Sequence, residues 1–141
     1  MKFRVFIDTN VFIYAYEYPK SNSASVIELL NHGKIEAVIS ERVFNEVLKY
    51  FETYHSLELM RHFRRYLLES TSVVARELLL EKMSELKGQI KDKDLEQLAV
   101  VKYLGIKYLL AYDRDFENFE EYNTPKKFVK ILELKPYAEE Y

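Results

Sequence analysis

The stretch "FIDTNVFIY", residues 6–14, places a single acidic residue, Asp8, between two apolar runs. Residues 2–7 predict a buried strand, and residues 10–18, which end before Pro19, predict a buried helix. A carboxylate at this junction has two interpretations. It is either a helix cap, because the short Asp side chain accepts hydrogen bonds from nearby backbone N–H groups, or a metal ligand. The other acidic residues of the chain bear on that choice.

Composition sets limits on the kind of protein. The chain has 141 residues, which indicates one domain, and a formal net charge of −2, so nucleic-acid binding would need a local basic patch. The absence of cysteine excludes disulfides, zinc thiolates and cysteine nucleophiles. No apolar stretch approaches the roughly 20 residues of a membrane helix, and the N-terminus lacks a signal-peptide pattern. We therefore expect a cytoplasmic protein.

Short apolar strands alternate with helices along the chain. Such alternation predicts an α/β fold in which helices cover both faces of a parallel sheet. Strands are expected at 35–39 and 107–111, with Val73-Val74 as an extended link. Helices are expected at 21–31, after Ser40, at 56–69 and 76–87, at 94–104 as an amphipathic helix, and after Thr124-Pro125, where Phe128, Ile131 and Leu132 share one face.

The five Asp residues have a distribution unlike that of the eighteen Glu residues, which are scattered as on a solvated surface. Every Asp follows a strand or begins a helix. Asp8 and Asp113 both follow apolar strands, and the ends of neighbouring parallel strands meet at one edge of a sheet. Two carboxylates that close repel each other unless a proton or a cation lies between them, and Mg²⁺ suits such a pair. Capping remains the simpler interpretation for any one Asp taken alone.

Two helices offer further acidic residues. In "SERVFNEVLKY", Glu46 lies on or beside the apolar stripe of its helix, where an unpaired buried Glu would need a partner; a position at the surface edge remains open. Asp94 lies at the N-terminus of its helix, where backbone N–H groups and the helix dipole favour an anion.

Four segments, "FIDTNVFIYA", "ISERVFNEV", "KDKDLEQLAV" and "YLLAYDRDF", resemble in order the motifs of the PIN domain family of metal-dependent ribonucleases. The resemblance covers nearly the whole chain. It implies a single domain over residues 1–141 with a three-layer α/β/α fold, a central parallel sheet of about five strands in the order 3-2-1-4-5, and often a homodimer. Two positions depart from the family pattern: Ala111 replaces a frequent Thr or Ser, and Gln97 replaces a frequent His.

The resemblance also implies hydrolysis of RNA phosphodiester bonds with Mg²⁺ or Mn²⁺. The family's acidic positions fall on Asp8, Glu46, Asp94 and Asp113, as catalytic residues and metal ligands, with Asp115 as an outer ligand or part of a second-ion site. Compact length favours a VapC-type toxin with an antitoxin partner. Alternatives are an RNA-processing nuclease that is not a toxin, an inactive module that binds RNA or protein, and a phosphotransfer receiver domain, although no strand-end Lys supports the last.

Candidates for RNA contact are Arg61, Arg64 and Arg65 in "MRHFRRY", and Thr9 and Asn10 beside Asp8. Basic residues interleaved with aromatic residues suit single-stranded RNA. A solvated helix face whose aromatic residues point inward is the simpler explanation of the arginine group.

Overall fold

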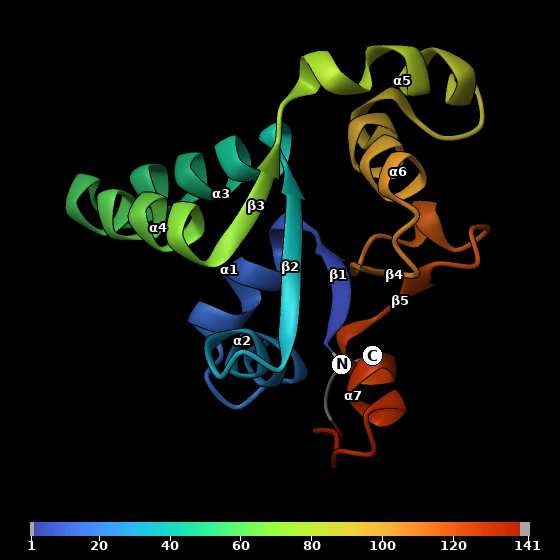
Figure 1. Cartoon of the computed structure of the whole chain (residues 1–141). Helices are drawn as coiled ribbons and strands as arrows, with labels where there is room; N and C mark the ends of the chain where they lie inside the picture. Colours follow the sequence, from blue (N-terminus) through green and yellow to red (C-terminus); the bar gives the residue numbers. More distant parts are fainter. Residues whose placement is uncertain (1, 139–141) are drawn as a thin grey trace.

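A five-stranded parallel sheet forms the centre of the protein in the computed structural model, which describes residues 2–138 (Figure 1). The strands lie in the order β3-β2-β1-β4-β5, and each neighbouring pair is parallel, as predicted. Their bounds are β1 Phe3–Ile7, β2 Ile35–Ser40, β3 Thr71–Val74, β4 Tyr108–Leu110 and β5 Tyr122–Asn123.

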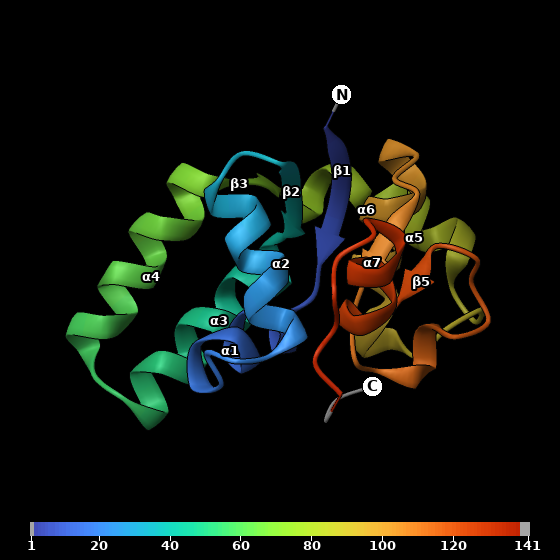
Figure 2. The same ribbon diagram turned by 90° about the horizontal axis from the view of Figure 1, so that it is seen from below.

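Helices cover both faces of the sheet, which gives the expected three-layer α/β/α architecture. Contacts join α1, α2 and α7 into one group and α5 and α6 into another, while α3 and α4 pack together beside the β3 edge (Figure 1 and Figure 2). The helices are α1 Thr9–Glu17, α2 Asn22–Asn31, α3 Glu41–Tyr54, α4 Leu57–Ser70, α5 Leu80–Leu86, α6 Asp92–Leu104 and α7 Pro125–Ile131, with short 3₁₀ helices η1 Arg76–Leu79 and η2 Arg114–Phe116. Within the described residues, no helix is both long enough and apolar enough to cross a membrane.

The helix ends follow the local sequence. Ser40 and Thr124 cap α3 and α7, as predicted, because each side chain accepts a hydrogen bond from the backbone N–H three residues later. Gly105 ends α6 in the left-handed region at φ 62°, a conformation that glycine adopts without steric cost. β1 lies at the centre of the sheet, and Val5, Phe6 and Ile7 are completely buried. The rigid centre of the fold thus leads directly into Asp8.

Three sequence predictions differ from the structure. Val73-Val74 is part of β3, an edge strand of four residues that is too short to show a period in the sequence. On α7, Phe128 and Val129 are buried, whereas Ile131 is 43% exposed, so the apolar face that Phe128, Ile131 and Leu132 share packs only partly against the core. The amphipathic prediction for α6 was also wrong: every residue from Asp94 to Val101 is buried. This helix contacts α5, η1, α3 and β2, so the polar side chains between Asp94 and Val101 face protein instead of solvent.

Candidate metal site

The acidic residues gather at the carboxyl ends of β1 and β4. The two strands pair with Ile7 opposite Leu110, and the backbone N–H of Asp8 donates a hydrogen bond of 2.9 Å to the carbonyl oxygen of Leu110. Asp113 follows three residues after that carbonyl. The structure therefore places Asp8 and Asp113 at the same edge of the sheet, as the parallel topology predicted.

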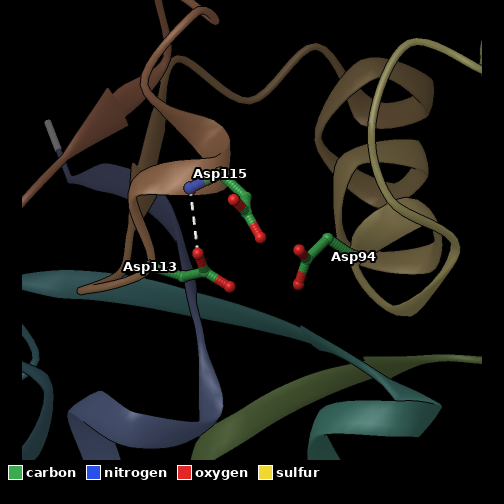
Figure 3. Close-up of side chains that lie close together, drawn as sticks. All are labelled: Asp94, Asp113 and Asp115. Atoms are coloured by element: carbon green, nitrogen blue, oxygen red, sulfur yellow. Dashed lines mark hydrogen bonds between the residues drawn. The ribbon is translucent and has the colours of Figure 1, made fainter.

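Three carboxylates form the tightest group, which we call the acidic triad: Asp94, Asp113 and Asp115. One oxygen from each lies within 4.8 Å of the others. Figure 3 shows Asp94 projecting from α6 toward Asp113 and Asp115, which lie on the η2 segment. Asp113 is also a cap, because its Oδ1 accepts a hydrogen bond of 2.9 Å from the backbone N–H of Asp115. Capping thus uses one oxygen of Asp113 and leaves the other facing the triad.

Asp8 lies at the N-cap position of α1, but its side chain makes no capping hydrogen bond. It is 8% exposed. Burial raises the pKa of this carboxyl to about 7; the backbone N–H of Thr9 opposes the shift, and the charges of Glu46, Asp94 and Asp113 add to it. The cap interpretation therefore does not account for Asp8. A buried carboxyl among other carboxyls is what a cation site requires.

Glu46 lies on α3 at the edge of the apolar stripe, which is the second of the two positions that the sequence left open. Its Oε1 accepts a hydrogen bond of 2.8 Å from the hydroxyl of Thr9, and its Oε2 lies 3.6 Å from Nε of Arg42. The side chain is 42% exposed. Glu46 and Asp8 do not belong to the triad, but their charges interact. The Thr9 hydroxyl directs the Glu46 carboxylate toward the start of α1.

Asp94 has a buried oxygen that lacks a hydrogen bond. The residue is 4% exposed, and its Oδ2 has no hydrogen-bond partner among the described residues. Burial, and then the charge of Asp113, raises the pKa of Asp94, while Lys93 opposes the shift. Partial burial also favours a higher pKa for Asp113, but the hydrogen bonds from Lys93 and from the backbone N–H of Asp115 outweigh it and lower that pKa. An unsatisfied buried carboxylate oxygen fits a cation, because such groups are normally paired.

Lys93 is a member of the site that the sequence indicated only as one of two lysines, with Lys91, flanking the motif around Asp94. Its ammonium lies 2.8 Å from Oδ2 of Asp113, 3.4 Å from Oδ2 of Asp94 and 3.6 Å from Oδ2 of Asp115. The only sequence signal was its position directly before Asp94 at the start of a helix.

Glu96 is a second residue that sequence reasoning missed, because it was counted among the surface glutamates. It is 3% exposed. One carboxylate oxygen accepts a hydrogen bond of 2.7 Å from the backbone N–H of Arg42, and the other accepts one of 2.9 Å from Arg76. Glu96 thereby joins α6, which carries Asp94, to the first turn of α3, which carries Glu46. Its place inside the apolar run "LEQLAVV" was the available signal.

The predicted RNA contacts lie in two places. Arg61, Arg64 and Arg65 are exposed on α4, which lies beyond the β3 edge of the sheet, whereas the triad lies at the β1 and β4 ends (Figure 1). Arg65 pairs with Glu69 at 3.1 Å. Thr9 and the exposed Asn10 follow Asp8 directly. The structure therefore brings Thr9 and Asn10 to the acidic site and leaves the three arginines outside it.

Comparison with known proteins gives one family match. The model of the PIN domain family matches residues 5–122. No curated protein matches the chain.

Solved structures share the fold at low sequence identity. A toxin–antitoxin complex from Klebsiella pneumoniae superposes with a TM-score of 0.69 at 18% identity, over 86% of this chain and 97% of that one. VapC20 from Mycobacterium tuberculosis, described as a sarcin-ricin loop cleaving toxin, superposes with a TM-score of 0.63 at 16% identity, over 81% of this chain and 93% of that one. VapBC-1 from nontypeable Haemophilus influenzae superposes with a TM-score of 0.63 at 22% identity, over 88% of this chain and 99% of that one.

Proposed function

The chain belongs to the PIN domain family, and from this premise we propose that it is a metal-dependent endoribonuclease that hydrolyses RNA phosphodiester bonds. One observation carries the proposal: three carboxylates lie within 4.8 Å of one another, beside a buried Asp8 whose pKa is raised to about 7. Carboxylates held this close, with one buried oxygen that makes no hydrogen bond and has only the Lys93 ammonium, 3.4 Å away, as its counter-charge, are arranged to share a cation.

The ligand chemistry favours Mg²⁺ or Mn²⁺. Both ions prefer oxygen ligands, and this site offers carboxylates without nearby thiols or imidazoles among the described residues. Asp8, Glu46, Asp94 and Asp113 would hold the ion directly or through water, with Asp115 as an outer ligand or part of a second-ion site. When bound, the ion lowers the pKa of a coordinated water and offsets the charge of the phosphate in the transition state.

The protein's own residues position this chemistry. Asp8 holds a carboxyl directly after Val5, Phe6 and Ile7, the buried part of β1, and its backbone N–H is fixed by the carbonyl oxygen of Leu110. The Thr9 hydroxyl orients Glu46, and Glu96 fixes α3 relative to α6. Because the triad and its neighbours include no histidine among the described residues, protons released in hydrolysis would pass to carboxylates or to solvent.

We further propose that the chain is the toxin of a toxin–antitoxin pair in the cytoplasm, and that it acts as a homodimer. The support is the shared fold with solved toxin–antitoxin structures, which this chain matches over most of its length. An adjacent gene for a small DNA-binding protein that copurifies with this chain would support the antitoxin partner. Copurification with RNA-processing factors instead would favour the nuclease that is not a toxin.

A second candidate is an inactive PIN module that binds RNA or protein. The observation that favours it is Ala111, which is completely buried at the end of β4 and offers no hydroxyl to orient a neighbouring acid or water. We prefer the nuclease because the carboxylates themselves are present and close together.

Cleavage of end-labelled single-stranded RNA tests the two candidates. The nuclease should cleave with Mn²⁺ or Mg²⁺ and stop in EDTA. Loss of a residue that only supports a metal ligand already lowers metal affinity or activity by about 10- to 100-fold. Asp113 would be a ligand itself, so Asp113→Asn should reduce the rate of cleavage by at least about 100-fold. Asp92→Asn is the matched control, because Asp92 is exposed at the start of the same helix as Asp94, and it should cleave normally. RNA binding without cleavage in either metal would support the inactive module and contradict the nuclease.

A further inference from the structure

The ammonium of Lys93 occupies the centre of the acidic triad. It hydrogen-bonds Oδ2 of Asp113 at 2.8 Å and lies 3.4 Å and 3.6 Å from Oδ2 of Asp94 and Asp115. The same oxygen of Asp94 is the buried atom without a hydrogen bond. Lys91, two residues earlier, is placed differently: among the described residues it pairs with Asp115 alone, at 3.3 Å, and its side chain is 68% exposed. The Lys93 ammonium therefore lies between the three carboxylates, where their negative charge is concentrated.

Charge explains why a lysine is stable there. Three carboxylates within 4.8 Å of one another repel, and a positive charge between them lowers that energy. A lysine amine carries a positive charge at neutral pH, and this one lies within 3.6 Å of an oxygen of each of the three carboxylates. In the absence of a metal ion, Lys93 supplies the compensating charge that the triad needs.

We infer that Lys93 is a tethered counter-ion that holds the triad together in the metal-free protein and is displaced when a divalent cation binds. The inference rests on the metal site of the proposed function. An ammonium and a divalent ion cannot share these oxygens, because both are cations and Mg²⁺ sits only about 2.1 Å from its ligands. The side chain can leave easily, since it is 53% exposed and its four-carbon stem is flexible.

Displacement makes a prediction about metal affinity. Part of the free energy of metal binding is spent in breaking the contacts of Lys93 with the triad, so removing its charge should tighten metal binding. Ion pairs of a partly exposed lysine are individually weak, and Lys93 makes three such contacts. We therefore expect Lys93→Met to bind Mn²⁺ roughly three- to tenfold more tightly than the wild type.

Stability of the metal-free protein gives an independent readout. In EDTA, Lys93→Met leaves the triad without its nearest positive charge, and the melting temperature should fall by about 3 °C. Saturating Mn²⁺ should remove the difference from the wild type, because the ion then compensates the carboxylates in both proteins.

Isothermal titration with Mn²⁺ and thermal melts of four full-length proteins test the inference. These are the wild type, Lys93→Met, Lys93→Arg and Lys91→Met. Lys93→Arg keeps the charge and should retain nearly wild-type affinity. Lys91→Met removes one charge from the same helix start without emptying the triad, and it should change the affinity less than twofold.

Three results would overturn the inference. The first is unchanged or weaker Mn²⁺ binding by Lys93→Met. The second is an equal gain in affinity for Lys91→Met, which would indicate a general charge effect instead of displacement. In either case metal-dependent cleavage by the wild type would leave the proposed function intact. The third is absence of Mn²⁺ binding by both the wild type and Lys93→Met, which would overturn the metal site together with the inference.

Discussion

Asp8→Asn should make the metal-free protein more stable at pH 8 while removing its response to metal. The ionised carboxyl is buried beside other carboxyls, which raises its pKa from 3.8 to about 7. The folded state therefore holds a proton that the unfolded chain has already lost between these two pH values. An amide has nearly the same shape and carries no charge. Asp8→Asn therefore avoids the loss of unfolding free energy that ionisation of the buried carboxyl causes.

The size of the effect follows from the shift in pKa. One pKa unit corresponds to about 1.4 kcal/mol, so ionised Asp8 costs at most about 4 kcal/mol of unfolding free energy at pH 8. Relaxation and entry of water reduce such penalties, and we expect a gain of about 2 kcal/mol for Asp8→Asn. Below pH 3.8 the carboxyl is neutral in both states and the cost is absent; it grows until about pH 7. At pH 5 the gain should therefore be less than about 1 kcal/mol.

Urea denaturation in EDTA at pH 5 and pH 8 measures this difference. Asp92→Asn is the matched control, because Asp92 is exposed and its replacement should change stability by no more than about 0.5 kcal/mol at either pH. Addition of Mn²⁺ should stabilise the wild type and leave Asp8→Asn unchanged. The reasoning is refuted if Asp8→Asn is less stable than the wild type at pH 8, or if its effect is the same at both pH values.

Three further substitutions test other parts of the site and fold. Glu96→Gln should lower the unfolding free energy by about 2–3 kcal/mol in urea denaturation, because its buried carboxylate accepts from both Arg42 and Arg76 and the amide cannot satisfy both; a loss below about 0.5 kcal/mol would contradict that role. Thr9→Val should weaken Mn²⁺ binding by about 10-fold in titration while the melting temperature changes little, since it frees the Glu46 carboxylate; unchanged affinity would show that Glu46 needs no such orientation. Gly105→Ala should cost about 1 kcal/mol in the same denaturation assay because of the positive φ, and an unchanged stability would argue against the left-handed end of α6.

Most of the fold could be predicted from the sequence, because the strongest sequence signals for helices and strands are local. The buried run of β1, the caps at Ser40 and Thr124 and the glycine after α6 each act over a few residues. β3 and β5 have four and two residues, which is too short for a periodic pattern, and their pairing depends on partners elsewhere in the chain. The enclosure of α6 was also hidden, because burial on all sides depends on which elements pack around a helix.

The residues of the candidate site also fall into two groups, those that could be predicted from local sequence and those that could not. Asp8 and Asp113 could be placed together because parallel strands end at one edge. Glu96 and Lys93 could not be assigned, because their significance lies in contacts with residues 20 to 54 positions away. Ionic and hydrogen-bonded pairs of that separation are created by folding and leave no spacing rule in the sequence. The arginines of α4 illustrate the converse, since a clear sequence cluster lies outside the acidic site.

The central position of β1 has a consequence for protein synthesis. Asp8 is translated well before Asp94 and Asp113, the two carboxylates with which its charge interacts and which follow 86 and 105 residues later. A ribosome adds about 5–20 residues per second, so roughly 5–20 s separate translation of Asp8 from that of Asp115. During that interval the nascent chain cannot assemble the acidic site. A growing copy of the proposed nuclease therefore cannot cut the messenger RNA that encodes it before nearly all of the domain has been made.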